Sequence, residues 1–128
     1  FVDVIAGDLK GGADTFTAAP ALTVLIGASA IGAESPLHGG SGRDRLLGGA
    51  GVDFLDGGGG PDALSGNGSS DLLRGGSGKD ELSGGDGPDA LFGGSGADVF
   101  DGGPGRDHCS GGGGRDRARD CTSLKKIP

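Results

Sequence analysis

The chain has 128 residues, of which 33 are glycine and five are aromatic, and its formal net charge is −7. This length fits one domain. The excess of acidic residues disfavours a nucleic-acid partner. No stretch approaches the roughly 20 consecutive apolar residues that a membrane-spanning helix needs, so we expect no membrane span.

Residues 1–38 contain three short β-prone segments. Residues 1–5 and 22–26 are rich in β-branched residues and leucine. Between them, residues 11–17 resemble a degenerate repeat in which Asp14 lies two positions before Phe16. Residues 28–36 carry no clear signal, and we expect a loop there. We interpret residues 1–38 as irregular first turns of the solenoid described next, with a small separate β unit as the alternative.

Residues 39–119 form nine consecutive blocks of nine residues without an insertion. Glycine predominates at positions one, two and four of the block. Position six is aspartate in every block: Asp44, Asp53, Asp62, Asp71, Asp80, Asp89, Asp98, Asp107 and Asp116. Position eight is apolar in every block: Leu46, Leu55, Leu64, Leu73, Leu82, Leu91, Phe100, Cys109 and Ala118.

The block divides into a loop part and a strand part. Glycines at positions one, two and four permit left-handed backbone conformations that a Cβ atom opposes. Positions seven to nine are too short for a helix and indicate a strand whose position-eight side chain points opposite to its two neighbours. A strand of three residues buries too little alone, so the blocks must stack into an all-β solenoid.

These blocks resemble the RTX (haemolysin-type) calcium-binding nonapeptide G-G-x-G-x-D-x-U-x, over 81 of the 128 residues. The resemblance implies a right-handed parallel β-roll (a β-solenoid) with two nonapeptides per turn. Odd blocks would form one sheet and even blocks the other, with the position-eight side chains between them.

In such a roll the aspartates of odd blocks line one edge and those of even blocks line the other. Neighbouring carboxylates about 4.8 Å apart repel by roughly 3 to 4 kcal/mol at an effective dielectric constant near 20. A Ca²⁺ ion between each pair reverses this, which gives four sites on one edge and three on the other, up to about seven ions. Without calcium, we expect this glycine-rich chain to be largely disordered.

The resemblance also implies that main-chain carbonyls at positions two and four complete each calcium site. The glycines at these positions are Gly40, Gly42, Gly49, Gly51, Gly58, Gly60, Gly76, Gly78, Gly85, Gly87, Gly94, Gly96, Gly103, Gly105, Gly112 and Gly114. Block four departs from the pattern, with Asn67 at position two and Ser69 at position four. The two sites that involve Asp71 are therefore expected to be the weakest.

Residues 120–128 form a tail that we expect to cap the open end of the roll and hide its last strand from edge pairing. The tail does not resemble a further repeat. Cys109 is expected to point inward, and Cys121 follows it by 12 residues. A disulfide between them would fix the tail over the end of the roll, with two free thiols as the alternative.

Positions seven and nine are expected to face solvent. On the sheet of the even blocks this places Phe54, Leu72 and Phe92 on one outer face. Exposed apolar ladders often mark contacts, so this face is a candidate surface for the rest of a parent protein or for another copy. A loop or the N-terminal segment covering the face is the alternative.

No catalytic signature occurs in the chain, and His38 and His108 lie far apart in sequence. The sequence therefore predicts a calcium-binding β-roll rather than an enzyme, acting as a structural or secretion-associated module of a larger, secreted, extracellular protein. The alternative is the C-terminal module of a secreted protease, lipase or polysaccharide epimerase, or of an adhesin. A catalytic domain would then lie before Phe1.

Overall fold

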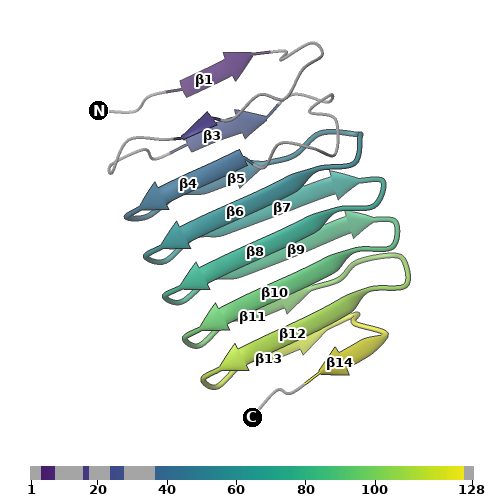
Figure 1. Cartoon of the computed structure of the whole chain (residues 1–128). Helices are drawn as coiled ribbons and strands as arrows, with labels where there is room; N and C mark the ends of the chain where they lie inside the picture. The colour runs from purple at the N-terminus through teal and green to yellow at the C-terminus, as the bar shows by residue number, and fades with distance from the viewer. Residues whose placement is uncertain (1–3, 8–15, 18–23, 28–36, 126–128) are drawn as a thin grey trace.

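The computed structural model describes residues 4–7, 16–17, 24–27 and 37–125, which form two parallel seven-stranded sheets facing each other (Figure 1). One sheet, here called the odd sheet, comprises β1 (Val4–Gly7), β3 (Val24–Gly27), β5 (Arg45–Leu47), β7 (Ala63–Gly68), β9 (Glu81–Asp86), β11 (Val99–Asp101) and β13 (Arg117–Arg119). The even sheet comprises β2 (Phe16–Thr17), β4 (Leu37–Ser41), β6 (Phe54–Gly59), β8 (Leu72–Ser77), β10 (Ala90–Ser95), β12 (His108–Gly113) and β14 (Ser123–Lys125).

Within the repeats, strands of one sheet pair in a register of two blocks. Phe54 lies opposite Leu72 in the even sheet, and Ala63 lies opposite Glu81 in the odd sheet. The chain thus alternates between the sheets and completes one turn every two nonapeptides. This confirms the predicted all-strand parallel β-roll, in which the nine regular blocks make about five turns.

A single file of position-eight side chains fills the space between the sheets. Those of blocks one to eight are buried, and Ala118 of block nine packs against them partly exposed. Leu37 belongs to the same core although it precedes the first block. The sequence carried a signal for it, because Leu37 lies nine residues before Leu46.

The strands of the regular turns are longer than predicted. Most run for six residues rather than three, from position seven of one block to position three of the next, as in β6 and β7. The glycines at positions one to three therefore continue the strand, and only positions four to six form the turn. The prediction of a strand limited to positions seven to nine is wrong in this respect.

The strands before block one extend the same two sheets. β1 pairs with β3, β3 pairs with β5, and β2 pairs with β4, all in parallel. Phe16 and Leu25 occupy backbone register positions equivalent to position eight, opposite Leu37 and Leu46 respectively. Asp14 and the expected loop at 28–36 lie outside the described residues, and the division of the chain at residue 38 stays a prediction.

The tail continues the roll more regularly than expected. β14 pairs in parallel with β12, and Leu124 lies opposite Cys109 in the backbone register. These two residues are 15 apart in sequence rather than 18, so the last turn is shortened. The tail does not repeat the nonapeptide sequence, yet after the shortened turn it adds a strand to the edge of β12.

The predicted disulfide between Cys109 and Cys121 is present, with a Cα–Cα distance of 5.9 Å. Cys109 is fully buried, and Cys121 packs against the core at the last turn. The bond therefore joins the core of the penultimate block to Cys121, two residues before β14.

The outer face of the even sheet is partly covered by its own side chains. Phe54, Leu72 and Phe92 are half-buried rather than exposed. The guanidinium of Arg74 lies 5.5 Å from the centre of the Phe54 ring. The rings of Phe92 and His108 pack edge to face, with their centres 6.1 Å apart. Within the ranges that the structure describes, no helix is long and apolar enough to cross a membrane.

Candidate metal centres

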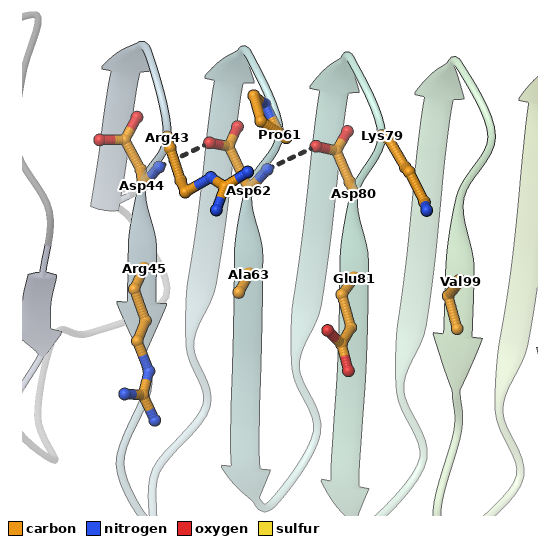
Figure 2. Close-up of a pocket in the computed structure, with 10 residues that line it drawn as sticks. All are labelled: Arg43, Asp44, Arg45, Pro61, Asp62, Ala63, Lys79, Asp80, Glu81 and Val99. Atoms are coloured by element: carbon orange, nitrogen blue, oxygen red, sulfur yellow. Dashed lines mark hydrogen bonds between the residues drawn. The ribbon is translucent and has the colours of Figure 1, made fainter.

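The nine block aspartates form two rows, one along each edge of the roll, at the turns that join the sheets. All nine are buried, with 0 to 8% of each residue exposed. Figure 2 shows Asp44, Asp62 and Asp80 of one row on successive turns. The stacking follows from the parallel register, because residues 18 apart occupy the same place in successive turns.

Hydrogen bonds connect each aspartate with the next in its row. The main-chain N–H of Asp44 donates to Oδ1 of Asp62 at 2.8 Å, and that of Asp62 donates to Oδ1 of Asp80 at 2.9 Å. The same bond recurs at 2.8 to 3.0 Å at all seven steps, four along the odd-block row and three along the even-block row. These are the pairs that the sequence placed together.

The second carboxylate oxygen is the unusual feature of each row. Oδ2 is buried without a hydrogen-bond partner in eight described aspartates: Asp44, Asp62, Asp71, Asp80, Asp89, Asp98, Asp107 and Asp116. A buried acceptor left unpaired costs about 1 to 3 kcal/mol, and more when it is charged. A cation or a proton at each of these oxygens would remove this cost.

Burial raises the pKa of seven of these carboxylates, and the charges of neighbouring carboxylates raise it further in five of them. Burial is the main cause that raises the pKa of Asp62 to about 6, with further increases from the charges of Asp80 and Asp44. The pKa of Asp71 is also raised to about 6, first by burial and then by Asp53 and Asp89. Hydrogen bonds from the main chain oppose the increase at both groups but do not cancel it.

Glycine at position one leaves space for the carboxylate. A Cβ atom at Gly57 would lie 2.5 Å from Oδ2 of Asp62, closer than any side chain tolerates. The glycines at position one do not have positive φ angles. The predicted reason for glycine at this position is therefore wrong: the requirement is room for the aspartate, not a left-handed backbone.

Glycines at positions two and four stack beneath carbonyl oxygens of the preceding turn. A Cβ atom at Gly58 would lie 2.2 Å from the carbonyl oxygen of Gly40, and one at Gly60 would lie 1.8 Å from that of Gly42. Both glycines have positive φ, of 96° and 108°. Two files of main-chain carbonyls therefore accompany each row of aspartates.

These carboxylate and carbonyl oxygens are suitable ligands for a hard cation. Ca²⁺ prefers carboxylate and carbonyl oxygens in a flexible arrangement, which is the chemistry that each edge offers. Among the described residues, no three His, Cys, Asp or Glu side chains converge on one point. A cation here would consequently depend on main-chain carbonyls as well as on aspartates.

A groove of about 660 Å³ follows the odd-block row (Figure 2). Arg43, Arg45 and Lys79 line it together with Glu81 and the three aspartates of this stretch. Basic and acidic side chains thus line the same groove as the carboxylate row.

The even-block row ends differently at the shortened last turn. Thr122 immediately precedes β14, as each aspartate precedes its strand, and its hydroxyl donates to the carbonyl of Asp107 at 3.1 Å. A neutral hydroxyl thus stands where the regular repeat has a carboxylate. Sequence reasoning missed this residue because the last turn is three residues short.

Three overlapping segments, residues 37–64, 56–91 and 83–118, match a family model described as RTX calcium-binding nonapeptide repeat (4 copies). Together they span well over half of the chain. No curated protein matches the chain, and no solved structure does so either.

Proposed function

The chain belongs to the RTX calcium-binding nonapeptide repeat family, and we propose from this premise that calcium ions between successive aspartates drive the folding of its roll. The RTX β-roll is a structural calcium-binding module, not a catalytic one. The finer proposal is that each ion joins the aspartates of two successive turns with carbonyls of positions two and four, at up to about seven places.

The buried, unpartnered Oδ2 atoms are the observation that carries this proposal. The core that would otherwise hold the fold is only one side chain per block wide. Without a cation, the roll would hold two rows of stacked carboxylates against their mutual repulsion. Calcium removes this penalty and bridges the turns at the same places.

We further assign the module to a larger secreted protein. The disulfide favours an oxidising compartment, where such bonds form and persist. Extracellular calcium is abundant enough to fill weak sites, so folding would follow export. The catalytic or adhesive partner domain foreseen as the alternative has no particular observation in its favour.

Far-ultraviolet circular dichroism during calcium titration tests the proposal. We expect a largely disordered spectrum in calcium-free buffer and a β-rich one at about millimolar Ca²⁺. Mg²⁺ should substitute poorly, because it demands stricter octahedral geometry. Identical spectra with and without calcium would contradict the proposal.

A further inference from the structure

Block four interrupts the glycine stack of the even-block turns. Asn67 and Ser69 occupy positions two and four and have φ angles of 79° and 80°, so they keep the left-handed backbone of the glycines they replace. Unlike glycine, both carry a Cβ atom. At these positions a Cβ points at the carbonyl of the preceding turn, as the distance of 1.8 Å at Gly60 shows.

The loop of block two, which precedes block four by one turn, is correspondingly irregular. Gly49 is the only position-two glycine among the nine blocks without a positive φ, and Gly51 at position four also lacks one. Gly105 in block eight also has no positive φ, but it keeps the regular stack: a Cβ atom there would lie 1.9 Å from the carbonyl oxygen of Gly87.

In the turn between blocks two and four, hydrogen bonds within the protein replace the regular stacking of glycines on carbonyl oxygens. The N–H of Gly49 donates to Oδ2 of Asp53 at 2.7 Å, so Asp53 is the one block aspartate whose Oδ2 has a partner. The amide Nδ2 of Asn67 donates to the carbonyl of Gly48 at 2.8 Å. The hydroxyl of Ser65 donates to Oδ1 of Asn67 at 3.0 Å, which holds this amide in orientation.

Block four alters the turn on its N-terminal side but not the turn on its C-terminal side. On the C-terminal side of block four, Gly85 and Gly87 are glycines and stack normally beneath the carbonyls of Asn67 and Ser69. Oδ2 of Asp71 and Oδ2 of Asp89 both remain without partners. Of the two steps that involve Asp71, only the one toward Asp53 is altered.

We infer that the turn between blocks two and four is closed by the Asn67 amide and the Gly49 N–H instead of by a cation. The N–H of Gly49 occupies the carboxylate oxygen of Asp53 that would otherwise be free to bind the ion, and an N–H group cannot itself bind a cation. Asn67 is thus a positioning residue that excludes calcium from one step. The nine blocks then bind six ions, one fewer than their seven aspartate pairs would allow. This inference rests on the proposed calcium function.

Counting bound ions by native mass spectrometry tests it. At saturation the double variant Asn67→Gly/Ser69→Gly should hold one Ca²⁺ more than the wild-type chain, because the regular stack becomes sterically allowed. Adding Asp53→Asn to that double variant should remove the gained ion. The same Asp53→Asn change in the wild-type chain should leave its count unaltered.

Asp89→Asn is the matched control on the same edge, and it should lower the wild-type count by at least one. An unchanged count in the double variant overturns the inference, as does loss of an ion from the wild-type chain on Asp53→Asn. A wild-type chain that binds no calcium at all refutes the proposed function instead, so the two failures are distinguishable.

Discussion

Oδ1 of Asp80 accepts a hydrogen bond from the main-chain N–H of Asp62 at 2.9 Å, which stacks the two carboxylates on one edge. The charge of Asp80 adds to the effect of burial and raises the pKa of Asp62 to about 6. Burial raises the pKa of Asp80 more than the hydrogen bond itself lowers it, so without calcium the aligned carboxylates favour protons.

This preference predicts that mild acid stabilises the calcium-free roll. Because the pKa of Asp62 rises from 3.8 to about 6 on folding, the folded state binds more protons than the unfolded chain between these values. The stabilisation is fully present below the lower value and is lost as the pH rises through the upper one. In calcium-free buffer, circular dichroism should show more β structure near pH 4.5 than near pH 7.5. The opposite trend would mean that the aspartates are not buried together.

Replacement by alanine should have very different effects at Gly57 and Gly59, two glycines of β6. A Cβ at Gly57 would lie 2.5 Å from Oδ2 of Asp62, whereas at Gly59 the nearest atom is Oγ of Ser77 at 3.4 Å. Gly57→Ala should displace the carboxylate and raise the calcium concentration at the folding midpoint by about tenfold or more, equivalent to ~1.4 kcal/mol. Gly59→Ala should change the midpoint by less than about twofold. Equal effects would refute the role assigned to position one.

Reduction of the disulfide should weaken the C-terminal end of the roll. Closing a loop of this size contributes about 3 kcal/mol in the chain-entropy view. The Cys109→Ala/Cys121→Ser variant should therefore need more calcium to fold and melt at a lower temperature. Intact-mass measurement after alkylation should find no free thiol before reduction and two afterwards. Two alkylated thiols in the unreduced protein would exclude the bond.

The outer face of the even sheet should be dispensable for folding. Phe54→Ser/Leu72→Ser removes half-buried side chains and the Arg74 contact with the ring, a loss of about 1 kcal/mol for that contact. Calcium-induced folding should survive this change. The control Leu55→Ser, one residue from Phe54 but in the core, should abolish it. If the double variant fails to fold, the assignment of inward and outward positions is wrong, and if it folds, the face remains available as the predicted contact surface.

The sequence was sufficient for the parallel fold, the core positions and the pairing of aspartates, because all three follow from an unbroken period. It was not sufficient for the features that depend on contacts between turns. The reason for glycine at Gly57 became visible only with the carboxylate of Asp62 beside it. The shortened turn before β14 removes three residues from the period, which hid the equivalence of Thr122 to an aspartate.

Because paired strand residues within the nine blocks lie 18 positions apart, this part of the roll tolerates some changes of length better than others. Loss of two adjacent blocks would leave every later strand in its own sheet and would only shorten the stack. Loss of a single block would move every later strand to the opposite sheet. If block three were lost, for example, Leu72 would lie on the outer face of the odd sheet, next to Arg45. Gain or loss of repeats in such a chain should therefore proceed by pairs.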